Sequence, residues 1–205
     1  MVTVSSGRRP GRPVGGKQVV DRELVLDAAE RAIRRDGPLV SLEAIALEAD
    51  VTKPVIYARI GGRTELSNAL SARLANRIVQ SVLSAIAGQP IGRSALVLFL
   101  AANLKTVAAN RELFLYVTGG SSDDSPQRSL YLASQSAAPL AAQLSQWRTA
   151  TGHDPVVAEA WSYAIIGMLQ LTSLWWLNQE ELTAHDLAEQ LAELLWSGLR
   201  TPPLA

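Results

Sequence analysis

The chain has 205 residues, 48% of them hydrophobic, which is enough for a core in one large or two small domains. Its 19 basic and 19 acidic residues balance, which excludes a protein that coats nucleic acid with its whole surface. Cysteine is absent, which excludes disulfides and thiol chemistry and suits a reducing cytoplasm.

Basic residues gather at the start of the chain. Residues 1–18 are rich in Gly, Pro, Ser and Arg and contain no acidic residue. We predict a flexible, basic arm there. The segment RPGRP that starts at Arg9 resembles the core of AT-hook peptides, and narrow minor grooves attract inserted arginine. We favour an interpretation in which Arg9 and Arg12 contact DNA mainly through their charge, without sequence preference. Sequence-specific recognition of the minor groove stays open as an alternative.

Two short helices are predicted after the arm. Apolar residues recur at three- and four-residue spacing from Asp21, which can cap the first helix, to Gly37-Pro38, which ends it. Ser41 caps a second helix, which ends at a turn formed by Asp50 and Val51.

A third helix is predicted from its cap, Thr52, to about Arg59. A helix that reads the DNA major groove must be exposed at one end and held rigidly by its neighbours. A small shared core is available from Ile45, Ala46, Val51 and Ile56. The exposed side chains would then meet phosphates or base edges, and the free N–H groups at the start of the next helix favour phosphate as well. We predict DNA contacts from Thr52, Lys53, Pro54, Tyr57, Arg59 and Arg63.

The rest of the chain is also predicted to be helical, around a flexible loop at 119–126. Gly61-Gly62 precedes a helix over 63–87, in which one apolar stripe recurs every four residues: Leu66, Leu70, Leu74, Ile78, Val82 and Ile86. Further helices are expected over 93–110 and in a short segment that ends near Gly119. A helix over 127–151 should kink or split at Pro139. The last two helices should run from Asp154-Pro155 to about 178, and from a capping box of Thr183 and Asp186 to about Arg200. Strand patterns of useful length are absent, so the predicted fold class is all-α.

Neither catalytic nor metal-binding residues are predicted. His153 and His185 each stand beside an acidic residue near an expected helix start, where polar side chains commonly serve as caps. Histidine and acidic residues do not occur at the spacing of a metal site, and the nucleophile motif G-x-S-x-G is missing. We therefore predict a protein that is not an enzyme and needs no cofactor.

Residues 22–66 carry a recognisable pattern. It consists of Leu26, Ala28, Ala29 and Gly37 in the first predicted helix, Ser41-Leu42 and Ile45-Ala46 in the second, and Val51-Thr52, Ile56-Tyr57 and Arg63…Leu66 in and after the third. This pattern resembles the N-terminal domain of TetR-family transcriptional regulators. The resemblance implies a helix-turn-helix domain over 19–66 and a helical effector-binding and dimerisation domain over 67–205.

Four residues depart from the usual pattern of that family. Asp50 stands where glycine is usual, Ile60 where phenylalanine is usual, and Arg59 and Arg63 where histidine and lysine are frequent. Aspartate tolerates left-handed backbone better than most residues, so the turn at Asp50 is expected to survive. The departures therefore affect base preference rather than the fold.

A pocket for a small hydrophobic or amphipathic ligand in the C-terminal domain is implied by the resemblance. Such sites combine apolar and aromatic walls with a few orienting polar groups. Candidate lining residues are Asn103, Gln135, Gln143, Trp147, Gln170 and Trp175. Position by position, each of them fits an ordinary core or surface residue equally well.

The last two predicted helices, at about 155–178 and 183–200, have broad apolar faces, and large uncovered apolar patches usually mark interfaces. In TetR-like proteins two such helices form a four-helix dimer interface. We expect a homodimer here, with an interface that contains Leu174, Leu191, Leu195 and Trp196. A symmetric dimer presents its two recognition helices to a palindromic site, about 34–36 Å apart or a multiple of that.

The most apolar window, Trp161 to Leu177, contains polar residues and lacks basic flanks, so we predict a buried helix rather than a membrane span. The first residues lack the apolar run of a secretory signal. We therefore expect a cytoplasmic protein with no membrane partner.

Taken together, these features predict a transcriptional regulator that binds double-stranded DNA, most naturally a repressor that a small molecule releases from a palindromic operator. One alternative from another class stays open. It is a small-molecule-binding or scaffolding α-helical protein whose N-terminal helices bind protein rather than DNA.

Overall fold

The computed structural model describes residues 21–119, 125–179 and 181–197. Within these ranges the chain is helical and has no strand, which confirms the all-α prediction. Its elements are α1 (Arg22–Asp36), α2 (Leu42–Glu48), α3 (Lys53–Arg59), α4 (Arg63–Ile86), α5 (Arg93–Ala109), α6 (Arg111–Gly119), α7 (Ser125–Ala150), the single 3₁₀ turn η1 (Pro155–Val157), α8 (Ala158–Trp176) and α9 (Ala184–Ser197).

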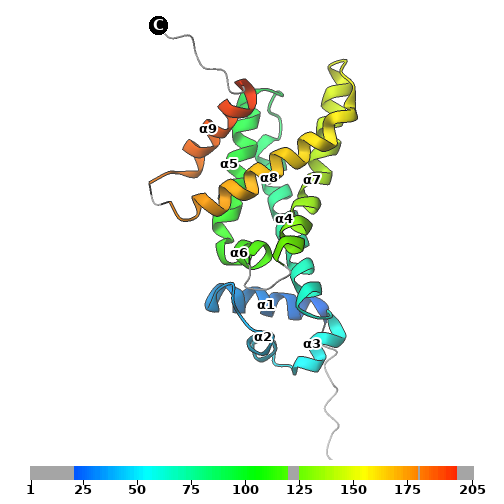
Figure 1. Ribbon diagram of the computed structural model, residues 1–205, viewed down its shortest axis with the longest axis vertical. Coiled ribbons are helices and arrows are strands. Elements are labelled where there is room, and N and C mark those ends of the chain that lie inside the picture. The colour runs from blue at the N-terminus through cyan, green and yellow to red at the C-terminus, as the bar shows by residue number, and fades with distance from the viewer. Residues whose placement is uncertain (1–20, 120–124, 180, 198–205) are drawn as a thin grey trace, which may run out of the picture.

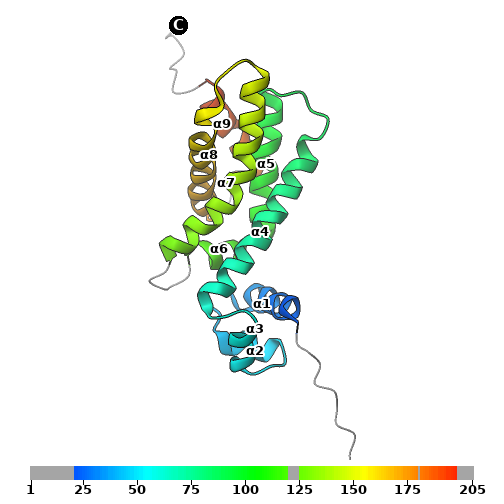
Figure 2. The ribbon, with the colours of Figure 1, turned by 90° about the vertical axis from the view of Figure 1, so that its right-hand side faces the viewer.

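The helices form two groups that share α4. Figures 1 and 2 show α1, α2 and α3 together at one end of the molecule and α5, α7, α8 and α9 in a bundle at the other end. α4 extends from the first group into the second. α6 lies between the groups and packs on α1, α4 and α7.

A small apolar core holds the three-helix group together. Ile45 and Ile56 are fully buried, Ala46 is buried, and Val51 packs against the same cluster, as the sequence predicts. Burial of each large aliphatic side chain contributes about 1.5–3 kcal/mol, which is why a unit this short can fix the direction of α3.

Helix caps in this group follow the predicted positions, although not all of them form a side-chain hydrogen bond. The Ser41 hydroxyl accepts a hydrogen bond from the N–H of Ala44 at 3.1 Å and so caps α2. Asp21 and Thr52 occupy the N-cap positions of α1 and α3, but neither side chain accepts a cap hydrogen bond.

Ion pairs tie α1 to its two neighbours. Arg31 and Arg35 of α1 both donate to the carboxylate of Glu48 on α2, and the pKa of Glu48 is held below its usual value, first by Arg31 and then by Arg35. Arg77 of α4 reaches Glu30 of α1 at 2.6 Å. Because these pairs are partly exposed, they contribute more to the orientation of the helices than to stability.

α4 begins at a turn that requires glycine. Gly61 has a φ of 104°, and a Cβ at this position would lie 2.8 Å from the Glu65 side chain. The Glu65 carboxylate accepts a hydrogen bond from the N–H of Gly62 at 2.7 Å, which closes the first turn of the helix. Beyond it, the predicted apolar stripe is buried from Leu66 to Val82.

Two small polar residues interrupt the buried surface of α4. Ser67 and Ser71 are fully buried, and neither hydroxyl has a hydrogen-bond partner among the residues that the structure describes. An unpaired buried hydroxyl weakens the packing on this face, since its lost hydration is not repaid by a hydrogen bond.

At Pro139 the structure excludes a split, one of the two predicted outcomes, and at Pro155 the start of the helix differs from prediction. α7 continues through Pro139 without a split, because its packing on α4, α6 and α8 outweighs the single hydrogen bond that proline removes. Pro155 opens the 3₁₀ turn η1 rather than α8, and the Asp154 carboxylate accepts a hydrogen bond from the N–H of Val156 at 2.8 Å.

One predicted boundary shifts at the start of α7, and two features of the last helix compare with prediction as follows. α7 starts at Ser125, which shortens the predicted loop. The Thr183 hydroxyl accepts from the N–H of Asp186 at 3.2 Å, which is one half of the predicted capping box. The predicted end of the last helix near Arg200 lies outside the described residues. Within the described ranges, none of the helices combines the length and the apolar character that crossing a bilayer requires.

The backbone of Asp50 yields a stability prediction. Its φ of 52° places it in the left-handed region, between α2 and α3. A β-branched residue pays about 1–2 kcal/mol there, so Asp50→Val should lower the free energy of unfolding by that amount. Asp50→Gly should cause no loss, because glycine adopts this conformation freely. Urea unfolding followed by circular dichroism measures both variants, and equal stability of the two would contradict the expectation.

Candidate nucleic-acid interface and ligand cavity

α3 lies at the end of the molecule that is away from the bundle (Figure 1), and several of its side chains are exposed. The buried side chain of Ile56 anchors this helix, while the Tyr57 side chain on the next residue is 51% exposed. Thr52, Pro54 and Arg59 are exposed as well. The structure thus brings most of the predicted DNA-contact residues onto one accessible helix, in the manner that insertion into a groove requires.

Lys53 and Arg59 differ in their surroundings. Lys53 forms an ion pair with Glu43 of α2, and this hydrogen bond raises the pKa of Lys53 and lowers the pKa of Glu43. Among the described residues, Arg59 has no carboxylate partner. Its charge is therefore directly available to a phosphate, whereas Lys53 must first leave Glu43.

Arg63 does not join this face. Its guanidinium donates a hydrogen bond to the carbonyl of Val40 at 2.7 Å, and its Cζ lies 5.9 Å from the ring centroid of Tyr116 on α6. The sequence placed Arg63 among the DNA contacts, but in the structure it lies at the junction between the two groups of helices. The nearest carbonyl and aromatic ring, which come from other helices, could not be known from residue type. Arg9 and Arg12 lie outside the described residues.

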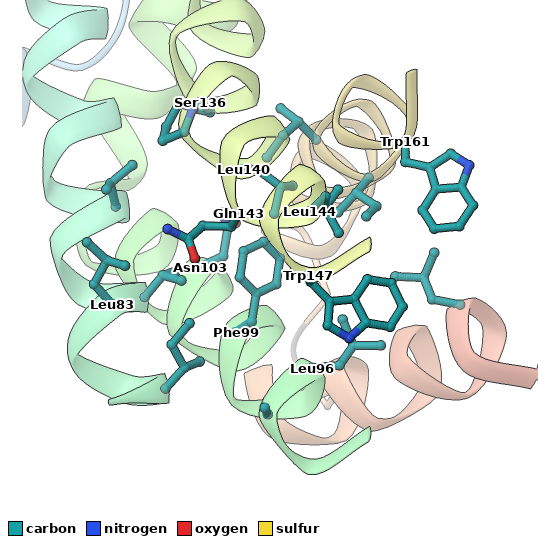
Figure 3. Close-up of a pocket in the computed structure, with 18 of the residues that line it drawn as sticks. Leu83, Leu96, Phe99, Asn103, Ser136, Leu140, Gln143, Leu144, Trp147 and Trp161 are labelled. Atoms are coloured by element: carbon teal, nitrogen blue, oxygen red, sulfur yellow. The ribbon is translucent and has the colours of Figure 1, made fainter. Parts of the chain in front are cut away.

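A cavity of about 620 Å³ lies in the helical bundle (Figure 3). Its walls come from α4, α5, α7, α8 and α9, and its volume is in the range of small-molecule sites. α4 contributes the far end of its apolar stripe, namely Ile78, Val82 and Ile86. Three tryptophans also line it: Trp147, Trp161 and Trp196.

The predicted ligand residues divide into two sets. Asn103, Gln143 and Trp147 line the cavity. Gln135 and Trp175 are exposed, Gln170 is half-buried, and these three residues are not part of the lining. Ser136 and the α4 residues of the wall were not predicted from the sequence. The apolar stripe of α4 continues beyond the three-helix group, and a stripe of this length needs a second apolar surface to pack against. This continuation could have indicated that α4 lines the cavity.

The predicted dimer residues also lie in different surroundings. Leu191 is 8% exposed and belongs to the core of its own bundle, because α9 packs on α5. Leu174 is half-buried, whereas Leu195 and Trp196 are exposed and line the cavity. The exposed apolar face of α8 instead comes from Tyr163, Leu171 and Trp175.

Sequence comparisons agree with this geometry. Residues 82–203 match the family model described as the tetracyclin repressor-like, C-terminal domain. An uncharacterized HTH-type transcriptional regulator of Mycobacterium tuberculosis strain H37Rv is 27% identical over 186 residues, which cover 89% of this chain and 78% of that protein.

Solved structures share the fold at low sequence identity. A putative TetR-family regulator from Syntrophomonas wolfei has a TM-score of 0.69 and 13% identity, over 88% of this chain and 96% of that one. The fatty acid degradation regulator FadR from Bacillus halodurans has a TM-score of 0.67 and 18% identity, over 93% and 100%. FadR from Bacillus subtilis in complex with stearoyl-CoA has a TM-score of 0.65 and 18% identity, over 87% of this chain and 99% of that one.

The different surroundings of Arg59 and Arg63 predict different effects on DNA binding. Arg59→Ala should weaken binding to all DNA sequences and reduce the slope of log affinity against log salt by about 1, because one phosphate contact is lost. Arg63→Ala, the matched control, should leave that slope unchanged, since its guanidinium is engaged by Val40 and Tyr116. Fluorescence anisotropy across a range of KCl concentrations measures both slopes, and an equal reduction for the two variants would refute the assignment.

Proposed function

Because this chain belongs to the TetR family of DNA-binding transcriptional regulators, we propose that it is a homodimeric repressor and that a small apolar molecule releases it from a palindromic operator. The family is one of regulators and not of enzymes. The observation that carries the proposal is the position of α4, which is part of the DNA-binding group at one end and of the cavity wall at the other.

The apolar stripe of α4 serves both groups. Leu66 and Leu70 are fully buried in the cluster that includes Ile45 and Ile56 of the three-helix group. Farther along the same face, Ile78 and other stripe residues line the cavity. A molecule that enters the cavity therefore contacts the helix on which the DNA-binding group is mounted.

Arg63 supports transmission of this movement. It lies in the first turn of α4 and contacts both the loop carbonyl of Val40 and the ring of Tyr116 on α6. A shift of α4 changes these contacts and, with them, the direction in which α3 points. In a dimer this shift changes the separation of the two recognition helices. A ligand stabilises the conformation whose cavity fits it, and with that conformation one particular separation.

On the DNA side, we assign base and phosphate contacts to the exposed face of α3, with Tyr57 and Arg59 at its centre. Arg9 and Arg12 of the basic arm add charge-based affinity in this proposal.

On the ligand side, the apolar lining favours a hydrophobic molecule. FadR from Bacillus subtilis, which shares the fold, has been solved with stearoyl-CoA, and this likeness supports a ligand with a long apolar part.

A gel-shift experiment with DNA from upstream of the protein's own gene tests the proposed function. Binding should be saturable, and its affinity should fall steeply with salt, because each phosphate contact contributes about 0.9 to the slope. A thermal-shift screen of hydrophobic compounds should then supply ligands that release the complex. Absent or salt-insensitive binding would instead favour a scaffold that binds protein.

The exposed apolar face of α8 yields a prediction about the dimer. Leu171 is 70% exposed and Trp175 is 53% exposed, and an uncovered face of this kind is typical of an interface. Leu171→Glu combined with Trp175→Glu should convert the dimer to a monomer, since four buried charges would face one another across a symmetric interface. Val156→Glu, at an exposed apolar residue on η1, is the control and should leave the dimer intact. Sedimentation velocity distinguishes the two states. A double variant that remains dimeric would move the interface elsewhere.

A further inference from the structure

We propose that the ligand of the cavity is an uncharged molecule with a long apolar body and one hydrogen-bonding group, such as a hydroxyl or a carbonyl, which Asn103 binds. The inference rests on the proposed function, because it names the chemical class of the ligand that would release the DNA. It sets this chain apart from FadR of Bacillus subtilis, which shares the fold and has been solved with stearoyl-CoA.

The first argument is the absence of charge. The cavity lining contains no Lys, Arg, Asp or Glu side chain among the residues that the structure describes. An anionic head group inside it would lose its hydration without gaining a counterion, which costs far more than the burial of a neutral polar group. A carboxylate or a phosphate therefore does not suit the interior of this cavity.

Two arginines that follow lining residues, Arg93 and Arg148, are also engaged. Arg93 follows the cavity residue Gly92, but its guanidinium is paired with Glu189 at 2.9 Å and with Glu193 at 3.3 Å on α9. Because two carboxylates offset its charge, this cation does not provide a free site for an anionic head group.

Arg148 follows the cavity residue Trp147. Its Cζ lies 4.5 Å from the ring centroid of Trp161, and its Nε donates to the carbonyl of Asp154 at 2.6 Å. The stacking and the hydrogen bond engage this side chain, and it is not part of the lining.

The second argument is a polar side chain that lacks a partner. Asn103 on α5 is 6% exposed and lines the cavity, and its amide makes no hydrogen bond with any described residue. Its amide keeps access to the cavity, since its atoms are not among the enclosed side-chain atoms that lack a partner. A ligand hydroxyl or carbonyl can pair with this amide, which both donates and accepts hydrogen bonds.

Two further polar groups accompany Asn103. Gln143 of α7 lies in the same part of the cavity in Figure 3, and no described residue pairs with its amide. Ser136, also on α7, is buried and lines the wall, and its hydroxyl has no hydrogen-bond partner among the described residues. These groups are neutral, so they match a neutral polar group on the ligand and offer no charge to an ionised one.

The apolar body of the ligand is accommodated by the rest of the wall. Most other lining side chains are aliphatic or aromatic, and each methylene group that they bury contributes about 0.8 kcal/mol. Figure 3 shows Trp147 and Trp161 on the opposite side of the cavity from Leu83. Three of the five tryptophans of the chain line the cavity, so intrinsic fluorescence reports its occupancy.

The test compares three probes that share one chain length and differ in head group: 1-dodecanol, dodecanoate and dodecanoyl-CoA. Titration of tryptophan fluorescence at pH 8, below the critical micelle concentrations, gives the three affinities. We expect dodecanol to bind at least tenfold more tightly than either anion. Tighter binding of dodecanoate or dodecanoyl-CoA, or no binding of any probe, would overturn the inference.

Substitution of Asn103 identifies the polar contact. Asn103→Leu should weaken dodecanol binding about tenfold, which corresponds to 1.4 kcal/mol. Gln135→Leu, a polar residue of α7 outside the lining, is the matched control and should leave dodecanol affinity unchanged. Unchanged affinity in Asn103→Leu would remove Asn103 from the site.

The same protein sample is assayed for DNA binding by gel shift, which separates the two proposals. Salt-dependent DNA binding together with a preference for an anion overturns the ligand class and leaves the repressor intact. A preference for dodecanol that depends on Asn103, together with no DNA binding, supports the ligand class and overturns the repressor.

Discussion

The continuous burial of one face of α4 is the constraint on which the rest of the structure depends. A helix of 24 residues with a stripe repeating every four residues needs apolar partners along its whole length. The three-helix group covers its first part, while the bundle covers the remainder and leaves the cavity beside it. Since both groups of helices pack on α4, a change in the packing of one group on this helix affects the packing of the other group. The buried serines Ser67 and Ser71 make this helix less firmly held, because their hydroxyls gain no hydrogen bond there.

Features that are encoded locally were predictable from the sequence. The cap at Ser41, the left-handed turn at Asp50 and the burial of Ile45 and Ile56 depend on neighbours a few residues away, and each is present in the structure. Family membership followed from the same local pattern, because the spacing of small and apolar residues in a helix-turn-helix is constrained by close helix crossing.

Features that depend on distant contacts were not predictable in the same way. The direction of the Arg63 side chain is set by Val40 and Tyr116, which approach it through folding of the whole chain. Likewise, Leu191 belongs to the core because α9 packs on α5, a contact between residues about a hundred positions apart, as in the Arg93–Glu189 pair. The sequence indicated that polar residues such as glutamine would line the cavity. It did not indicate which face of α7 turns inward, and that face includes Gln143 but not Gln135.

The ion pair between Lys53 and Glu43 has a consequence for how the protein moves along DNA. Glu43 acts as an internal counterion of Lys53, on the face that we propose to bind DNA. When Lys53 contacts a phosphate of a random sequence, it gains that ion pair but loses the pair with Glu43. The net attraction is therefore smaller than for an unpaired lysine. On the proposed interface, a wrong site would therefore release the protein sooner than it would if Lys53 were unpaired.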